Sequence, residues 1–110
     1  MTELAKEHCQ EYPKGTAPLS EDEAAKLAQE VPAWERNGTS SLRREYSFDT
    51  FRDAFGMVAR AALVAEREWH HPEIELGWGR AAFELTTHTA GGLTRNDFIM
   101  AARLDQLTED

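Results

Sequence analysis

Residues 66–72 read EREWHHP and separate a long helical pattern from a strand pattern. The helix is expected to end before Pro72, because proline disfavours the α-helical region for the residue that precedes it. His71 is therefore predicted to lie at a break between two regular elements. Side chains of adjacent residues point in different directions, so we expect His70 and His71 to contact different neighbours.

The segment before this junction contains the clearest helical pattern in the chain. Its apolar residues recur at intervals of four, three, four, three and four: Phe51, Phe55, Val58, Ala62, Ala65 and Trp69. That spacing places them on one face of a helix, and we predict that this face packs in the hydrophobic core. Asp49 is the expected N-cap of the helix.

Two strand patterns follow the junction. Apolar and polar residues alternate over residues 73–78 and again over residues 81–88, and Gly79-Arg80 supplies the expected tight turn between them. His88 ends the second pattern on its polar face, so we do not expect this side chain in the core.

Three histidines are therefore expected near one end of the sheet, because the second strand returns His88 toward His70 and His71. Histidine titrates near neutral pH, so converging imidazoles indicate a site of proton transfer. A three-histidine zinc site is the less favoured interpretation, because the adjacent His70 and His71 are awkward joint ligands.

The rest of the chain adds a hairpin and two helices. Ser20 and Glu23 have the spacing of a capping box at the start of a helical pattern. Asn37-Gly38 is a strong hairpin signal and joins two predicted strands. Thr94 and Asp97 have capping-box spacing at the start of the last helix, so Asp97 has a structural explanation that involves no chemistry.

The resulting order is helix, strand, strand, helix, strand, strand, helix. It predicts a single α+β domain over residues 19–110, with a four-stranded antiparallel sheet and helices packed on one face. Residues 1–18 contain proline and glycine without a regular period, and we expect an extended or partly disordered lead. The uncovered face of the sheet must be polar or meet another subunit, and Trp78 with the apolar strand residues favours a dimer.

The composition limits the classes of partner. The chain has 110 residues and a formal net charge of −8, which disfavours nucleic acid because its phosphates would be repelled. A small molecule or a protein is the expected partner. The single cysteine, Cys9, rules out an intrachain disulfide. The charged start lacks the apolar run of a signal peptide or membrane span, so we expect no membrane association and a cytoplasmic location.

Three motifs together resemble the pterin-4a-carbinolamine dehydratases, also called 4a-hydroxytetrahydrobiopterin dehydratases. They are the run from Glu66 to Ile74 with its His-His-Pro, then Thr86-Thr87-His88, then residues 91–98 with the sequence GGLTRNDF. The similarity extends from about residue 19 to residue 107 and includes Pro32-Ala33-Trp34. It implies the same four-stranded fold and a homodimer or homotetramer.

The resemblance also implies an activity, that of a hydro-lyase. Such enzymes remove water from the 4a-carbinolamine of a tetrahydropterin and give quinonoid dihydropterin, which recycles the tetrahydrobiopterin-type cofactor of aromatic amino-acid hydroxylases. The family uses no metal and no organic cofactor. The expected partner is thus a small pterin substrate.

The resemblance assigns roles to individual side chains. His71 and His88 would be the acid and base pair, in an order that the sequence does not decide, and His70 would complete the catalytic group by binding and positioning the pterin. Asp97 would orient a histidine or contact the pterin. The other residues at substrate-binding positions are Glu66, Trp34, Pro72 and Thr87.

Some positions depart from the family pattern. Trp69 stands where a small polar residue is usual, Gly77 and Gly79 flank Trp78 where a Ser-Tyr-Asn type sequence is common, and Thr89 replaces a frequent acidic residue. The alternative is therefore a dehydratase-like protein without significant activity that acts as a binding or assembly factor. The fold is reused in this way as a Rubisco assembly chaperone and as a transcription-factor dimerisation partner.

Overall fold

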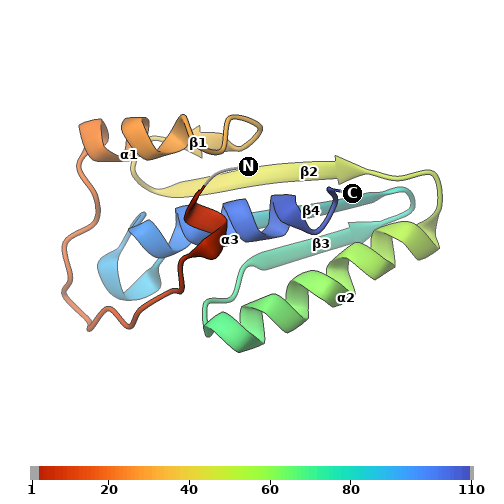
Figure 1. Cartoon of the computed structure of the whole chain (residues 1–110). Coiled ribbons are helices and arrows are strands. Elements are labelled where there is room, and N and C mark those ends of the chain that lie inside the picture. The colour runs from red at the N-terminus through yellow and green to blue at the C-terminus, as the bar shows by residue number, and fades with distance from the viewer. Residues whose placement is uncertain (1–2, 110) are drawn as a thin grey trace.

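The computed structural model describes residues 3–109, and its helices and strands follow the predicted order (Figure 1). The α-helices are α1 (Glu21–Ala28), α2 (Phe51–Glu68) and α3 (Arg95–Gln106). The strands are β1 (Glu35–Asn37), β2 (Ser41–Ser47), β3 (Glu73–Gly77) and β4 (Arg80–Leu85). Short 3-10 turns, η1 (Glu3–Lys6) and η2 (His88–Ala90), complete the structure. The predicted α+β fold is confirmed.

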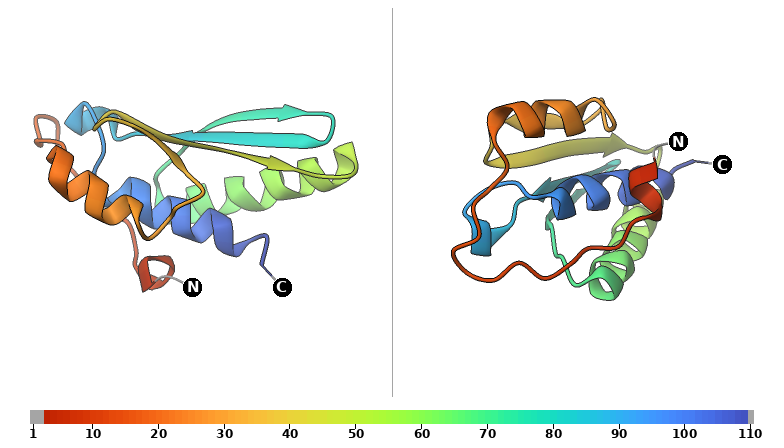
Figure 2. Two further views of the ribbon diagram at one scale, coloured as in Figure 1. Left: turned by 90° about the horizontal axis from the view of Figure 1, so that it is seen from above. Right: turned by 60° about the vertical axis from the view of Figure 1, so that its left-hand side comes forward.

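The strands form one antiparallel sheet in the order β1-β2-β4-β3. The central pair is β2 with β4, in which Leu42 lies opposite Leu85 and Ser47 opposite Arg80. The helices lie on one side of the sheet and leave the other side uncovered, as Figure 2 shows. Within the described residues, no helix is both long enough and apolar enough to cross a membrane.

Strand β2 contributes alternate residues to the covered face. Leu42 and Tyr46 are buried there, and Arg44 lies between them. The Arg44 guanidinium lies 2.6 Å from the carboxylate of Asp105, in the last turn of α3. The same guanidinium lies 4.2 Å from the centre of the Tyr46 ring. This pairing explains how a charged residue occupies an otherwise apolar alternation.

The uncovered face of the sheet is polar. Arg43 and Arg80 alternate there with Glu45 and Glu75, and their charged groups lie 3.1 to 4.0 Å apart. Exposed ion pairs of this kind contribute little to stability, but they keep the face hydrated. Of the two predicted possibilities for this face, the structure has the polar one.

The predicted core face of α2 is only partly correct, because Ala65 is buried and Val58 packs against the core but the large aromatic residues of that face do not. Phe51, Phe55 and Trp69 are 46%, 54% and 76% exposed. The face that packs inward instead carries Ala54, Met57, Ala61, Val64, Ala65 and Glu68. This helix is apolar on two faces, and its small alanines allow the backbone to approach the sheet more closely than the phenylalanines would. Periodicity alone did not distinguish the two faces.

Local signals at three element ends also differ from the predictions. The N-cap of α2 is Thr50 instead of Asp49, and its hydroxyl accepts from the Asp53 backbone at 3.0 Å. The β3–β4 turn is Trp78-Gly79, one residue earlier than predicted, and Gly79 takes a φ of 69°. The last strand stops at Leu85, before η2.

The N-terminal lead holds defined contacts over its described part. Leu4 and Ala5 of η1 are buried in the same core as α3. Residues 7–20 then run without helix or strand along one end of the molecule, in the red to orange trace of Figure 1. The predicted lead began at residue 1 and the predicted domain ended at residue 110, and residues 1, 2 and 110 lie outside the described part.

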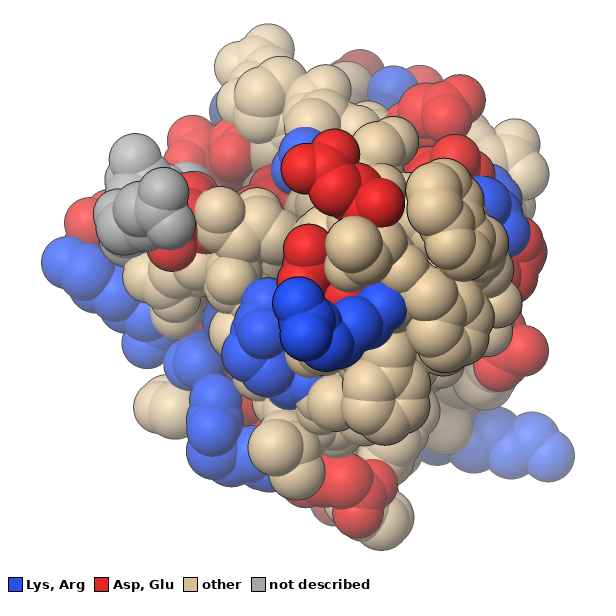
Figure 3. All heavy atoms as spheres, turned by 90° about the vertical axis from the view of Figure 1, so that its right-hand side faces the viewer, with Lys and Arg blue, Asp and Glu red and all other residues tan. Residues whose placement is uncertain are grey.

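One side of the molecule carries a broad uncharged surface. Figure 3 shows this side, where the β3–β4 hairpin and the start of α2 lie, with uncharged surface beside a group of Lys and Arg side chains. The large apolar residues exposed in these elements are Phe51, Phe55, Ile74, Leu76 and Trp78. Single exposed apolar residues are ordinary, but a contiguous group indicates an interaction surface.

Candidate functional site

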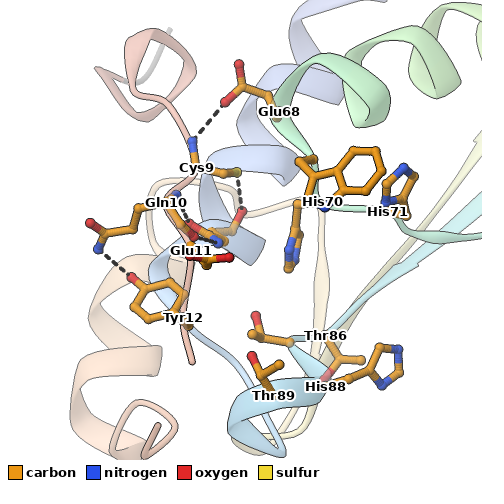
Figure 4. A pocket seen from close by; sticks show the side chains of 13 residues that line it. Cys9, Gln10, Glu11, Tyr12, Glu68, His70, His71, Thr86, His88 and Thr89 are labelled. Carbon is orange, nitrogen blue, oxygen red and sulfur yellow. Dashed lines mark hydrogen bonds between the residues drawn. The ribbon is translucent and has the colours of Figure 1, made fainter. Parts of the chain in front are cut away.

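A cavity of about 430 Å³ lies where four parts of the chain meet. Its walls come from residues 9–12, from residues 68–71 at the end of α2, from residues 86–89 around η2, and from Asn96 of α3. Figure 4 shows residues 9–12 on one side, Thr86, His88 and Thr89 on another, and His70 projecting between them. The volume falls within the range of small-molecule sites.

The junction after α2 directs its two histidines to different environments. Trp69 is the C-cap and takes a left-handed conformation, φ 56° and ψ 45°, which costs a non-glycine residue roughly 1 kcal/mol. The backbone N–H of His70 then donates to Ala65 at 3.2 Å. After this reversal the His70 side chain is 11% exposed and that of His71 is 48% exposed. The prediction that these adjacent histidines contact different neighbours is confirmed.

His70 is held by a buried carboxylate. Its Nε2 lies 2.6 Å from Oδ1 of Asp97, which is fully buried. The second oxygen of Asp97 accepts from the Thr87 hydroxyl at 2.8 Å and from the Thr94 backbone at 2.9 Å. Asp97 therefore caps α3, as predicted, and fixes the imidazole of His70 with the oxygen that the cap does not use.

His71 has a more exposed partner. Its Nε2 lies 2.5 Å from Glu66 Oε2, and its ring meets the edge of the Trp69 indole at a centroid distance of 5.0 Å. Its Nδ1 has no hydrogen-bond partner within residues 3–109. Glu66 and Trp69 thus restrict the orientation of an imidazole that still has one nitrogen available.

His88 is the first residue of η2 and reaches the same cavity. The backbone around it is closed by paired hydrogen bonds between Thr87 and Gly92, at 3.1 and 3.3 Å. Gly92 is required there, because an added Cβ would stand 2.6 Å from the carbonyl oxygen of Thr39. The imidazole of His88 is exposed and has no hydrogen-bond partner in the described part of the chain.

Not every residue predicted for the site lines this cavity. Thr87 does, whereas Trp34, Glu66, Pro72 and the fully buried Asp97 are not among its lining residues. Trp34 is buried elsewhere and donates from its indole nitrogen to Asp105 at 2.9 Å. Glu66 instead reaches the site through its contact with His71.

The cavity contains residues that sequence reasoning missed. They are Cys9, Gln10, Glu11, Tyr12, Glu68 and Asn96. Glu68 follows Ala61 and Val64 at helical spacing, so its inward position could have been inferred once the buried face of α2 was known. Residues 9–12 carry no periodic signal, and nothing in their sequence predicts that they reach the histidines.

Two of these residues have perturbed protonation equilibria. Burial by itself would raise the pKa of Glu68, but hydrogen bonds from the Cys9 backbone and His8 and the charge of Arg103 outweigh it, and the pKa is lowered from 4.5. Burial, reinforced by the charges of Glu68 and Asp97, raises the pKa of the Cys9 thiol to about 12. Glu68 is therefore a carboxylate and Cys9 a neutral thiol at physiological pH.

The described residues contain no group of three or more His, Cys, Asp or Glu side chains placed to hold a metal ion. The histidines have other partners instead, since His70 bonds to Asp97 and His71 to Glu66. The arrangement suits proton transfer. It brings a half-buried, fixed imidazole and two more exposed imidazoles to one cavity.

Comparison with known proteins gives a consistent result. Residues 17–107 match the family described as pterin 4 alpha carbinolamine dehydratase. The chain is 42% identical to a protein of Rubrobacter xylanophilus over 97% of this chain and 100% of that protein, and 44% identical to one of Chlorobium limicola over 99% of both. Both carry the name "Putative pterin-4-alpha-carbinolamine dehydratase".

A solved structure shares the fold. It is named as the transcriptional coactivator/pterin dehydratase from Brucella melitensis and superposes with a TM-score of 0.78 at 32% sequence identity. The superposition covers 84% of this chain and 99% of that one. With the family match spanning most of its length, this chain belongs to the pterin 4 alpha carbinolamine dehydratase family.

Proposed function

We propose that this protein is a hydro-lyase that removes water from a 4a-hydroxytetrahydropterin and yields the quinonoid dihydropterin. The observation that carries the proposal is the cavity that His71 and His88 both line beside His70, itself held by the buried Asp97. Membership of the family supports the substrate class. The product would be recycled to the tetrahydrobiopterin-type cofactor of aromatic amino-acid hydroxylases.

The reaction needs one proton donated to the 4a-hydroxyl group and one proton removed from N5 of the pterin. A protonated imidazole donates to the 4a-hydroxyl, the C4a–O bond breaks and water leaves. A neutral imidazole accepts the proton of N5, and the electron pair of the N–H bond forms the N5=C4a double bond. His71 and His88 are the two groups assigned to these steps, because both line the cavity and each has a ring nitrogen without a protein partner in the described part of the chain.

His70 is assigned to positioning. Both its exposure and its freedom are limited, since Asp97 holds Nε2 at 2.6 Å and the side chain is 11% exposed. A fixed imidazole at the centre of the cavity can orient the flat pterin ring so that C4a and N5 meet the other two histidines. Thr87, which lines the cavity, bonds to Asp97 and supports the same arrangement.

The proposal is tested by the rate of carbinolamine decay, followed by ultraviolet absorbance as the hydroxylated pterin forms and disappears. Wild type should accelerate the decay. His71→Ala and His88→Ala should each reduce the acceleration by about a hundredfold or more, the usual contribution of one general acid or base.

Arg67→Ala is the matched control, because Arg67 is exposed on the last turn of α2 beside Glu66 and lies outside the cavity. This variant should behave as wild type. A wild-type rate equal to the uncatalysed rate would reject the proposed activity.

A second function is supported by a different observation. Phe51, Phe55 and Leu63 expose large apolar side chains on α2, and the similar Brucella protein is named a transcriptional coactivator as well as a pterin dehydratase. We propose that this face of α2 binds protein, in the first instance further copies of this chain as a homodimer or homotetramer. In a chain without dehydratase activity, the same face would serve a binding or assembly factor, such as a Rubisco chaperone or a transcription-factor dimerisation partner.

A further inference from the structure

Trp69 has an unfavourable backbone conformation at the end of α2. It takes φ 56° and ψ 45°, and it is the one non-glycine residue with a positive φ among residues 3–109. Bulky side chains are rare in this region, and helices that end there usually carry glycine, or sometimes asparagine. Strained residues cluster at functional sites, so this position is a candidate for a functional role.

The fold does not require tryptophan at this position. The turn that ends the helix is made by the backbone, since the N–H groups of Trp69 and His70 both donate to the carbonyl of Ala65. The Trp69 side chain is 76% exposed, and its indole N–H has no hydrogen-bond partner in the described part of the chain. The side chain therefore adds strain in exchange for little burial and no hydrogen bond.

The same side chain lines the cavity that contains the histidines. Trp69 is the largest apolar residue among those that line this cavity, and His70 and His71 follow it directly in the chain. Figure 4 shows these two histidines at the end of α2, with Thr86 and His88 across the cavity from them. Small-molecule sites combine apolar and aromatic surface with a few polar groups. Trp69 supplies such a surface beside the polar groups of this site.

The indole lies next to His71 in an edge-to-face arrangement. The two ring centroids are 5.0 Å apart and the ring planes meet at 81°. A flat ligand stacked on the indole would lie parallel to it, and so nearly perpendicular to the imidazole of His71. The hydrogen bonds of an imidazole lie in its own plane. The hydroxyl group on the tetrahedral C4a stands out of the pterin plane, so a stacked pterin suits a hydrogen bond between that hydroxyl and His71.

We propose that the indole of Trp69 is a stacking platform for the pterin ring. This inference rests on the proposed function, because the ligand is the substrate of that reaction. The pyrimidine half of a tetrahydropterin is flat, and its face can cover an aromatic side chain. Stacking of this kind depends on the face of the ring and needs no hydrogen bond. Trp69 is thus a binding residue, and proton transfer is left to His71 and His88.

Equilibrium binding tests the platform directly. The ligand is 6-methyl-7,8-dihydropterin, which has no 4a-hydroxyl group and does not react, and its dissociation constant is measured by isothermal titration calorimetry. Trp69→Asn should weaken binding by roughly tenfold, the usual contribution of one stacked aromatic side chain. Trp69→Phe keeps an aromatic face and should stay within about threefold of wild type.

Thermal unfolding and kinetics separate binding from support of the fold. Asparagine takes the left-handed conformation more readily than tryptophan, so Trp69→Asn should raise the melting temperature while it weakens binding. In the carbinolamine decay assay it should raise KM by roughly tenfold and leave kcat unchanged, because stacking acts equally on the substrate and the transition state. A residue that only supports the fold would lose stability together with affinity.

Trp78→Asn is the matched control, because Trp78 is also 76% exposed but lies in the β3–β4 turn, outside the cavity. It should bind the dihydropterin as wild type does. The inference is overturned if Trp69→Asn has the wild-type affinity, or if Trp69→Phe binds no better than Trp69→Asn. A fall in kcat with KM unchanged would also overturn it, since Trp69 would then act through His71.

The binding measurement also separates this inference from the proposed activity. If wild type binds the dihydropterin but does not accelerate dehydration, the activity is rejected and the affinities of the variants decide the inference. If wild type accelerates dehydration and Trp69→Asn has the wild-type affinity, the activity stands and the platform is rejected. A wild-type protein that neither binds nor accelerates rejects both.

Discussion

The two carboxylate oxygens of Asp97 have different partners. One oxygen completes the cap of α3 with Thr94, and the other holds His70 at 2.6 Å. The carboxylate is fully buried, so each of its hydrogen bonds is formed away from water. A change that keeps the shape but removes the charge separates these contributions.

We expect Asp97→Asn to lower both activity and stability. An amide group of the same size retains an acceptor for the cap or for His70 but not for both, because one of its ends is a donor. The free energy of unfolding should fall by about 1–3 kcal/mol, and kcat/KM for carbinolamine dehydration by roughly tenfold. Urea unfolding and the decay assay measure the two effects. Asp49→Asn, an exposed loop position, is the control, and unchanged kinetics in Asp97→Asn would show that His70 needs no fixed orientation.

At this scale the sequence predicts local partners better than distant ones. The bond between Thr94 and Asp97 was found because its members stand three residues apart, at a recognised spacing. The contact between Asp97 and His70 spans 27 positions, and no periodicity encodes it. Only the family resemblance pointed to it. Trp34 shows the opposite case, since the resemblance placed it near the substrate and its indole lies with Asp105.

Helix α2 connects the core to the site through its buried face. The residues that pack against the sheet are mainly small, and Glu68 continues this face at the C-terminal end. There it anchors residues 8 and 9 of the N-terminal segment. The identity of the helix and its end at the histidines were predicted correctly, but its orientation was not, because two apolar faces compete for the core.

We expect the attachment of the N-terminal segment to weaken in acid. The pKa of Glu68 is lowered on folding from 4.5, so its stabilising contribution is complete above that pH and is lost as the pH falls toward the folded value. At pH 7, Glu68→Gln should be about 2 kcal/mol less stable than wild type. The difference in free energy of unfolding between wild type and Glu68→Gln should narrow below pH 4.5, because wild type then loses the charge of Glu68 and the variant has no charge there to lose.

Urea unfolding at a series of pH values measures this dependence. Glu73→Gln, at an exposed position in β3, is the control and should follow wild type throughout. A constant difference between wild type and Glu68→Gln across the acid range would contradict the assignment, because it would mean that the charge of Glu68 is not what holds the segment.

The whole molecule combines a net charge of −8 with an exposed apolar face on α2. The uncovered face of the sheet carries charged side chains that form ion pairs with one another. The exposed phenylalanines of α2 are therefore the stronger candidates for self-association. Burial of one phenylalanine contributes roughly 2 kcal/mol, and several such side chains from each copy can stabilise a dimer.

We expect Phe55→Glu to dissociate the assembly. Phe55 is 54% exposed on α2, so a charge there leaves the fold intact but must be desolvated in any interface that covers it. Light scattering after size exclusion should give a multiple of the 12.4 kDa chain mass for wild type and a smaller mass for the variant. Arg60→Glu on the same helix is the control. A wild-type protein that is monomeric at high micromolar concentration would reject self-association through this face.

The fold as a whole was predictable because its signals are short in range. Alternation over five to seven residues, two turn motifs and two capping boxes specify the elements, and the antiparallel order follows from the short connections. The site was only partly predictable. His88 was expected to approach the histidines at the end of α2, but the wall built by residues 9–12 depends on Glu68 and Asn96, which reach it from more than 50 positions away.

The left-handed conformation of Trp69 has a consequence for how this gene can vary. The left-handed conformation of this one residue turns the chain so that the side chain of His70 is mostly buried and that of His71 is half-exposed. Loss or gain of one residue between Ala65 and Pro72 would displace Glu68, His70 and His71 from their partners, although both histidines would still be encoded. The length of this junction therefore constrains sequence change in addition to the identity of its side chains.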